Sequence, residues 1–216
     1  MTDIIVYLKN PAPGEVKTRL QTRYTPEQAA RLYRAFIQDT IETARSVEAD
    51  RYFAAYTPTG CEIEIEELVP EGWDLIPQVG ADLGGRMLGS LRSGITSGAD
   101  KVVLIGTDIP SLPRSHLLSA INRLDNNDLV LGPTTDGGFY LIGTRITLPE
   151  IFPEVTWSTD KVFEQATAGI RSHGLLMSLI PPWHDIDTPE DLDAALLQAR
   201  AETMRHTRSA VDALTN

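Results

Sequence analysis

Short apolar runs alternate with helical patterns along almost the whole chain, and this alternation restricts the fold more than any other sequence feature. Ile4–Leu8 and Lys101–Gly106 have the composition of strands that are buried on both faces. Between them, apolar residues recur at steps of three and four from Ala29 to Val47, which is typical of a helix with one buried face. The sequence therefore predicts an α/β protein, a three-layer αβα sandwich around a mostly parallel sheet.

The remaining elements follow the same alternation. The first helix begins at a capping box of Thr25 and Gln28, with Pro26 in its first turn. Alternating Glu and Ile residues over 62–67 fit a strand or a short helix, and we favour a helix. The other expected strands are Arg51–Tyr56, Trp73–Val79, Asp128–Gly132, a return strand Phe139–Gly143 and Leu175–Ile180, and the other expected helices are Met87–Thr96, Arg114–Leu124, Asp160–Ser172 and one capped at Thr188–Pro189.

Length and composition favour one domain over residues 1–216. With 216 residues, of which 42% are hydrophobic, the chain can bury one sizeable core, and no linker or repeat divides it. From about residue 202 the periodicity is weak. We expect this final stretch to fray or to pack on a partner, such as the second copy in a homodimer.

Charge and cysteine content exclude several classes of protein. A formal net charge of -11 argues against a broad nucleic-acid surface, which needs clustered Lys and Arg. The single cysteine, Cys61, offers neither a disulfide framework nor a thiolate zinc site. The apolar run at Ile4–Leu8 is too short for a signal peptide or a membrane span. We therefore expect a cytoplasmic protein with no membrane insertion.

Ligands of open α/β sheets bind beyond the carboxyl ends of the strands, so the residues that follow each expected strand are the candidate site. After the first strand, Gly14, Lys17 and Arg19 combine a flexible loop with two cations, which suits a diphosphate. The alternative is a solvated basic loop.

An acidic residue, Asp108, follows the Lys101–Gly106 strand and precedes Ile109-Pro110. A carboxylate in this position suits Mg²⁺ or Mn²⁺, which would bridge it to phosphate oxygens. The alternative is that Asp108 accepts backbone hydrogen bonds and starts the turn.

The Asp136-Gly137-Gly138 sequence lies between two expected strands, where the backbone can approach a ligand closely. Asp136 is the candidate base for an acceptor hydroxyl, although Asp-Gly-Gly also makes a hairpin turn. Tyr140 and Trp157 are candidates for stacking on a base or sugar, and burial in the core is the alternative for both.

Two further segments carry charged groups. Asp185 and Asp187 lie on one face if their segment is extended, and they either contact a metal or phosphate or cap the following helix. Asp82 and Arg86 flank a glycine-rich turn that opens a helix. This helix N-terminus either favours an anion or is a plain terminus with Asp82 as its cap.

Taken in order, these motifs resemble a family of bacterial transferases with the nucleotide-diphospho-sugar transferase (GT-A) type of fold, sometimes linked to arsenosugar biosynthesis. Lys9–Leu20 and Ile105–Leu112 match the family's motifs completely, and Gly132–Gly143 matches with Phe139 for a Tyr. The Trp-Ser-Thr and Asp-x-Asp-Thr motifs recur at Trp157 and Asp185. The chain departs from the family at Gly85, where the family usually has Glu.

The resemblance implies a nucleotide-activated donor at the carboxyl edge, with Lys17 and Arg19 near its phosphates and Asp108 as the metal ligand. It favours glycosyl transfer from a nucleoside-diphosphate sugar to a small-molecule acceptor. The fold and the Lys-Thr-Arg-Leu loop also occur in nucleotidyltransferases such as the phospholactate guanylyltransferases, which supply the alternative function. A nucleotide-binding module without turnover is the third hypothesis.

Overall fold

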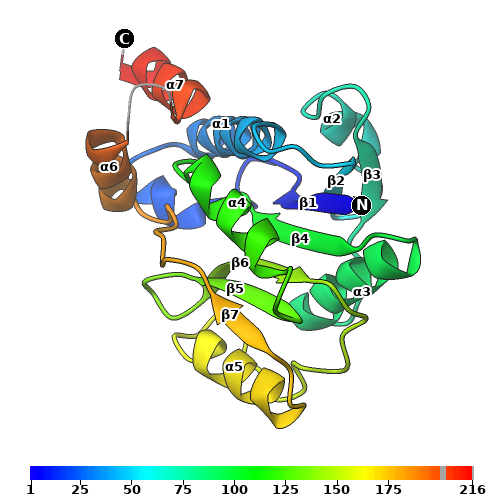
Figure 1. Ribbon diagram of the computed structural model, residues 1–216. Helices are drawn as coiled ribbons and strands as arrows, with labels where there is room; N and C mark the ends of the chain where they lie inside the picture. Colours follow the sequence, from blue (N-terminus) through cyan, green and yellow to red (C-terminus); the bar gives the residue numbers. More distant parts are fainter. Residues whose placement is uncertain (200–202, 216) are drawn as a thin grey trace.

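A seven-stranded sheet forms the centre of the computed structural model, which describes residues 1–199 and 203–215 (Figure 1). The strand order is β3-β2-β1-β4-β6-β5-β7. Strand β6 runs antiparallel to β4 and β5, and the other neighbouring strands pair in parallel. The strands are β1 (Thr2–Lys9), β2 (Arg51–Thr57), β3 (Asp74–Pro77), β4 (Lys101–Gly106), β5 (Leu129–Pro133), β6 (Phe139–Thr144) and β7 (Met177–Leu179).

Helices cover both faces of the sheet. Helices α1 (Pro26–Arg45) and α4 (Arg114–Arg123) pack on one face, and α3 (Leu83–Thr96) and α5 (Val162–Ser172) pack on the other (Figure 1). The predicted three-layer α/β architecture is therefore confirmed. None of the described helices combines the length and the apolar character needed to cross a membrane.

The alternating environment of β1 explains its continuous apolar run. Ile4, Val6 and Leu8 belong to the core on the α1 side, whereas Ile5 and Tyr7 belong to the core on the α3 side. Because successive side chains point to opposite faces of a strand, a strand covered on both faces needs apolar residues at every position.

Capping explains where two of the helices begin. The predicted box at the start of α1 is formed, with the Thr25 N–H donating to Gln28 Oε1 at 2.9 Å. Helix α3 begins at Leu83, where Asp82 caps it, whereas the sequence predicts a start at Met87. The predicted start is late because Gly84 and Gly85 in the first turn have no apolar side chains, so this turn shows no helical spacing of apolar residues. The predicted short helix over 62–67 is α2 (Glu62–Glu66).

The C-terminal part adds α6 (Pro189–Gln198) and α7 (Arg205–Thr215). Helix α7 packs on α1, and both carboxylate oxygens of Asp39 accept hydrogen bonds from its first turn, from the N–H groups of His206 and Thr207 at 2.9 Å each. Residues 202 and 216 of the stretch with weak periodicity lie outside the described residues.

The chain reverses its direction of winding between β1 and β4. It passes from β1 outward to β2 and β3, and then returns to β4 on the other side of β1. In open α/β sheets, ligands bind in the crevice at such a switch point. The loops that follow β1 and β4, which contain Lys17 and Asp108, meet there.

Candidate active site

A cleft of about 500 Å³ lies at the carboxyl ends of β1 and β4. Its volume is in the range of small-molecule sites. The lining comprises residues from the ends of β1 and β4, the loop after β1, the start of α3, and β6, with Tyr33, Gln78, Ser158 and Asp187 completing it.

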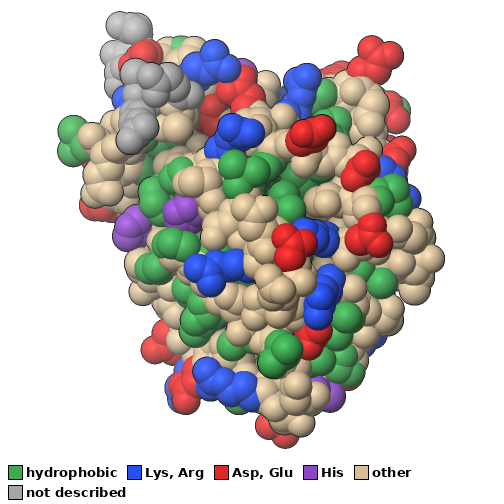
Figure 2. Space-filling view, in the orientation of Figure 1, with side chains coloured by type: hydrophobic (Ala, Val, Ile, Leu, Met, Phe, Trp, Pro, Cys, Tyr) green, Lys and Arg blue, Asp and Glu red, His purple; other side chains and the backbone are tan. Residues whose placement is uncertain are grey.

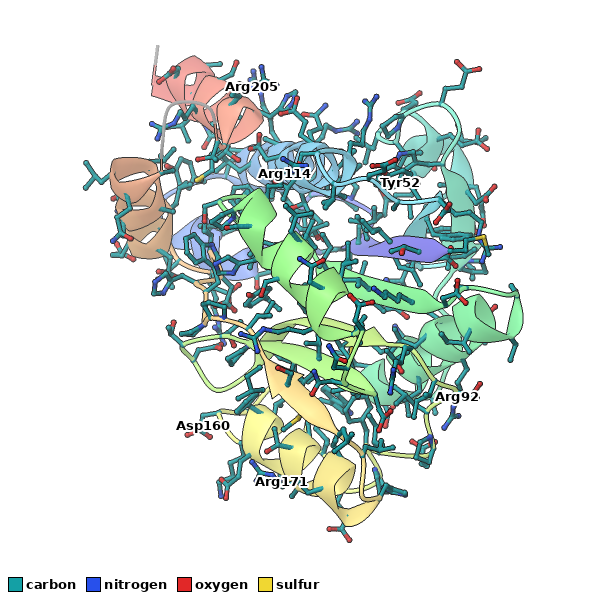
Figure 3. All side chains as sticks on the ribbon, in the orientation of Figure 1. Tyr52, Arg92, Arg114, Asp160, Arg171 and Arg205 are labelled. Atoms are coloured by element: carbon teal, nitrogen blue, oxygen red, sulfur yellow. The ribbon has the colours of Figure 1, made fainter. Side chains whose placement is uncertain are left out.

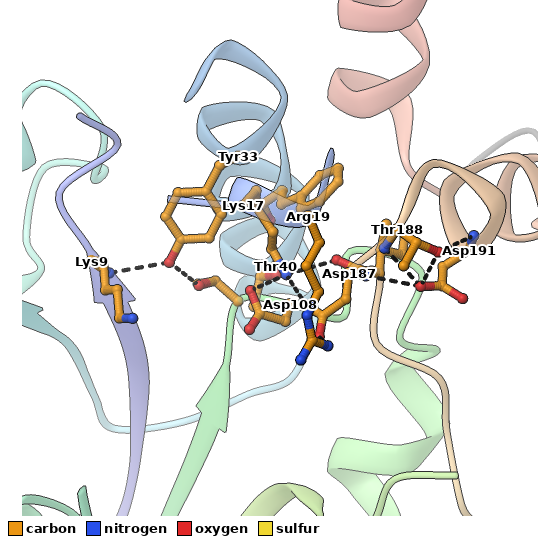
Figure 4. A network of polar contacts seen from close by, with 12 residues as sticks. Lys9, Lys17, Arg19, Tyr33, Thr40, Asp108, Asp187, Thr188 and Asp191 are labelled. Carbon is orange, nitrogen blue, oxygen red and sulfur yellow. Dashed lines mark hydrogen bonds and ion pairs between the residues drawn. The ribbon is translucent and has the colours of Figure 1, made fainter. Parts of the chain in front are cut away.

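Lys17 is the centre of the site. Its Nζ lies 2.7 Å from Asp108 Oδ1, 2.9 Å from Asp187 Oδ1 and 2.7 Å from the main-chain oxygen of Ile186 (Figure 4). An ammonium has three donors, so these oxygens use all of them. The side chain is only 5% exposed. The structure thus brings together the predicted residues Lys17, Asp108 and Asp187.

The two acidic partners of Lys17 stabilise its charged form. Burial, the largest influence, lowers its pKa, but the attraction and hydrogen bonds of Asp108 and Asp187 outweigh burial and raise the pKa to about 12. The residue also has left-handed backbone angles, φ 46° and ψ 45°. Such strain in a residue other than glycine occurs mostly at functional sites.

Two other predicted residues of the loop after β1, Gly14 and Arg19, are exposed. Gly14 adopts φ 83° in an exposed turn, which a residue with a side chain adopts with strain. The Arg19 side chain is 73% exposed, and its guanidinium lies 3.2 Å from Asp187 Oδ2. Arg19 therefore presents a cation at the rim of the cleft while Lys17 is held inside.

A hydrogen-bond chain missed by sequence reasoning supports this arrangement. The Lys9 N–H donates to the Tyr33 hydroxyl at 3.1 Å, Tyr33 lies 2.8 Å from the Thr107 hydroxyl, and Thr107 donates to the main-chain oxygen of Tyr7 at 3.3 Å. Burial, together with the negative charge of Asp108, raises the pKa of Tyr33 to about 12, so the phenol keeps its proton. In the sequence, Tyr33 is one more member of an apolar helical face.

The Asp136 turn has the hairpin geometry. Asp136 Oδ1 accepts hydrogen bonds from the Thr134 hydroxyl and from the Gly138 N–H, the latter at 3.2 Å. Gly137 has φ 96°, and a Cβ there would lie 2.1 Å from the oxygen of Asp160, which precedes α5 (Figure 3). Gly137 therefore allows close packing of this turn against the chain before α5, whereas a Cβ at Gly138 would meet Thr134 of the turn itself. Asp136 is exposed, and its assignment as a base stays a prediction.

Tyr140 packs in the core beside the cleft. It is 5% exposed, and its hydroxyl donates to the Pro181 oxygen at 2.9 Å and lies 2.7 Å from Nδ1 of His116. The Tyr140 ring also fills the space that a side chain at Gly132 would need. In this structure the phenol is engaged with the protein rather than free for stacking.

Trp157 belongs to an aromatic cluster with Phe139 and Phe152, with ring centroids 6.3 Å and 5.5 Å away. Its Nε1 is buried and has no hydrogen-bond partner among the described residues. The ring packs against Gly84, where a Cβ would lie 2.6 Å from it. Trp157 therefore does not line the cleft itself. It packs against Phe139 and next to Leu83, and these two residues do line the cleft.

Asp82 and Arg86 are not among the residues that line the cleft. Asp82 Oδ1 accepts the Gly85 N–H at 2.7 Å, which is the capping geometry. The Nε of Arg86 donates to the Gly80 oxygen at 3.4 Å. Both side chains therefore contact their own loop.

The two acids before α6 do not cap that helix. Thr188 and Asp191 form the capping box instead. Asp187 reaches Lys17, while Asp185 lines a neighbouring hollow of about 660 Å³ between α6 and the start of α4. Burial, followed by the negative charge of Asp136, raises the pKa of Asp185 to about 6. No cation pairs with Asp185 among the described residues.

Charged side chains elsewhere form local pairs. On the face drawn in Figure 2, Lys and Arg are interspersed with Asp and Glu. Asp39, Glu42 and His206 also have oxygen or nitrogen atoms close together. However, Asp39 caps α7, and Glu42 pairs with Arg205 at 2.9 Å, so these acids already have partners.

Comparison with known proteins identifies relatives of the whole chain. Residues 40–159 match a family described as "uncharacterized protein conserved in bacteria (DUF2064)". A Desulfovibrio desulfuricans protein, provisionally described as a nucleotide-diphospho-sugar transferase, is 31% identical, with a TM-score of 0.90 over 98% of this chain and 94% of the other. No protein of curated function matches.

More distant structures share the fold alone. The 4-diphosphocytidyl-2C-methyl-D-erythritol synthase of Anaerococcus prevotii is 13% identical, with a TM-score of 0.62 over 92% of this chain and 98% of the other. A Mycobacterium tuberculosis protein in complex with manganese is 17% identical, with a TM-score of 0.51 over 91% of this chain and 98% of the other.

Proposed function

Since the chain belongs to the bacterial family that its residues 40–159 match, we propose that it is a metal-dependent transferase that uses a nucleotide-activated donor. The reaction proposed is transfer of the sugar from a nucleoside diphosphate sugar to the hydroxyl of a small-molecule acceptor. The observation that carries the proposal is the convergence of Lys17, Asp108 and Asp187 in the switch-point cleft. The name given to the D. desulfuricans relative agrees with it.

The oxygens around Lys17 fit a hard divalent cation. Asp108 Oδ1, Asp187 Oδ1 and the Ile186 oxygen all lie within 2.9 Å of one cationic atom. Mg²⁺ and Mn²⁺ prefer carboxylate and carbonyl oxygens. We propose that Asp108 and Asp187 hold the metal, which would neutralise charge on the leaving diphosphate.

The remaining roles follow from charge and position. Arg19 is exposed at the rim and Lys17 is buried inside the cleft, so both cations can contact the diphosphate of a bound donor. In the transfer, the acceptor oxygen forms a bond to the anomeric carbon while the bond from that carbon to the diphosphate breaks. The acceptor proton passes to a carboxylate, for which Asp136 is the candidate.

Calorimetric binding of nucleoside diphosphates, nucleotide sugars and nucleoside triphosphates, each with Mn²⁺, with Mg²⁺ and with chelator, tests the proposal. We expect metal-dependent binding of one diphosphate or its sugar. Preference for one triphosphate would instead indicate nucleotidyl transfer with release of pyrophosphate. Metal-dependent binding without turnover of any donor would indicate a non-catalytic nucleotide-binding module.

Asp108→Asn, with Asp193→Asn as the control, tests the site itself. Each carboxylate is half exposed, 52% and 53%, and each accepts from one cation at 2.7 Å, but Asp193 pairs with Arg23 outside the cleft. We expect Asp108→Asn to abolish metal-dependent nucleotide binding and Asp193→Asn to retain it. If Asp108→Asn binds metal and nucleotide as the parent does, Asp108 is structural and the proposed site is wrong.

A further inference from the structure

We infer that Lys17 is an internal counter-ion for the two metal-binding carboxylates, so that a divalent cation gains both of them only when an anionic ligand draws the ammonium away. This inference rests on the proposed function and adds an order of binding to it. The metal would enter together with the donor's diphosphate rather than before it.

The first step of the argument is steric. The ammonium lies at 2.7 to 2.9 Å from Asp108 Oδ1, Asp187 Oδ1 and the Ile186 oxygen, at the centre of the oxygens that a metal would use. Mg²⁺ binds such oxygens at about 2.1 Å. One point cannot hold both cations, and their repulsion adds to the exclusion.

The second step concerns where the ammonium can go. All of its donors are used by the protein, so Lys17 cannot bind a phosphate without giving up at least one of these three oxygens. On the buried side of the ammonium, Nζ lies 5.9 Å from the centre of the Phe36 ring. On the other side lies the cleft, which Lys17 lines together with Asp108 and Arg19. An anion in the cleft is therefore the ligand that can attract the ammonium.

The third step is the charge balance. In the free protein, Lys17 and Arg19 neutralise Asp108 and Asp187 through direct ion pairs. A diphosphate that takes the two cations leaves two carboxylates, and one divalent cation restores neutrality. Either ligand alone leaves uncompensated charge in a partly buried site, which is unfavourable.

Lys17→Met tests the inference because methionine keeps an unbranched side chain that extends as far as Cε and removes the ammonium. Binding of Mn²⁺ alone is measured by the loss of the free-ion signal in electron paramagnetic resonance, without nucleotide. We expect Lys17→Met to bind Mn²⁺ at least about tenfold more tightly than the wild type. Arg23→Met, which removes a cation that pairs with Glu190 and Asp193, should leave the affinity unchanged.

A double variant identifies the site that gains affinity. Adding Asp108→Asn to Lys17→Met should abolish the gain. Equal Mn²⁺ affinity in the wild type and Lys17→Met, or a gain that survives Asp108→Asn, would overturn the inference. The proposed function is judged separately, by metal-dependent nucleotide binding to the wild type.

Thermal unfolding gives a second readout, which holds even if Lys17→Met folds poorly. Without the ammonium, Asp108 loses its cation and Asp187 keeps only Arg19, so Mn²⁺ should raise the melting temperature of the variant more than that of the wild type or Arg23→Met. An equal or smaller rise in Lys17→Met would contradict the inference.

Discussion

The phenolic oxygen of Tyr33 lies 2.8 Å from the Thr107 hydroxyl, and this hydrogen bond joins helix α1 to the turn that presents Asp108. The same phenol accepts the N–H of Lys9 at the end of β1. One side chain therefore connects the two strands that flank the cleft to the helix above them. We therefore expect the position of Asp108 to depend on this connection.

Tyr33→Phe should lower both stability and metal-dependent nucleotide binding. The change leaves the partly buried Lys9 N–H without its acceptor, which costs about 1 kcal/mol in the free energy of unfolding. Urea denaturation and calorimetry measure the two effects. Tyr52→Phe is the control, because the Tyr52 hydroxyl also has two hydrogen-bond partners, the Val47 oxygen and the Ala49 N–H, and both lie outside the cleft. Equal nucleotide binding by the two variants would show that the Tyr33 chain does not position the site.

Gly85→Glu should stabilise the protein without changing nucleotide binding. Gly85 is the third residue of α3, and Asp82 caps that helix, so a Glu at position 85 would complete a capping box. Replacing a helical glycine and adding an acid to the first turn should contribute about 1 kcal/mol. A rise in the urea midpoint with unchanged affinity is expected. A change in donor specificity would instead mean that the family's Glu contacts the substrate.

His116 should make the protein less stable as the pH falls below about 6.5. Burial lowers the pKa of His116 in the folded state below its ordinary value. The unfolded chain therefore takes up a proton that the folded state resists, and the stabilisation present above pH 6.5 is lost as the pH falls. Urea denaturation between pH 8 and pH 5 should show that the free energy of unfolding falls less in His116→Gln than in the wild type. His173→Gln, at the exposed end of α5, should follow the wild type.

Asp185→Asn should stabilise the metal-free protein at neutral pH. The carboxylate of Asp185 is half-buried, pairs with no cation among the residues described, and lies in the field of Asp136, Asp187 and Asp108. Removing its charge relieves both burial and repulsion. Thermal unfolding in chelator should give a higher midpoint for the variant. A lower midpoint would mean that the charge of Asp185 has a stabilising partner.

Local patterns in the sequence were sufficient to predict most of the fold. The apolar run of β1, the helical spacing of α1 and the Thr25–Gln28 cap each depend on neighbouring residues, and each is present in the structure. The exceptions have local causes. The start of α3 was placed too late because Gly84 and Gly85 carry no apolar side chain to reveal its face.

The site was harder to predict because its contacts join distant segments. Lys17 and Asp187 were each recognised, but their ion pair depends on how strand order brings two loops together. Asp82 fitted both a cap and a ligand, since both functions use the same carboxylate at a helix start. Tyr33 gave no signal at all, because a tyrosine on an apolar helical face has the same spacing whether or not its hydroxyl is used.

The separation of Lys17 from Asp187 by 170 residues has a consequence for synthesis of the protein. Chains emerge from the ribosome at about 5–20 residues per second, so many seconds pass between the two residues. During this time the nascent chain gains Asp108, one of the two acids that pair with the ammonium of Lys17, but still lacks Asp187. The N-terminal half therefore cannot complete its site alone, because a product truncated before Asp187 holds Lys17 with only one of its two acidic partners.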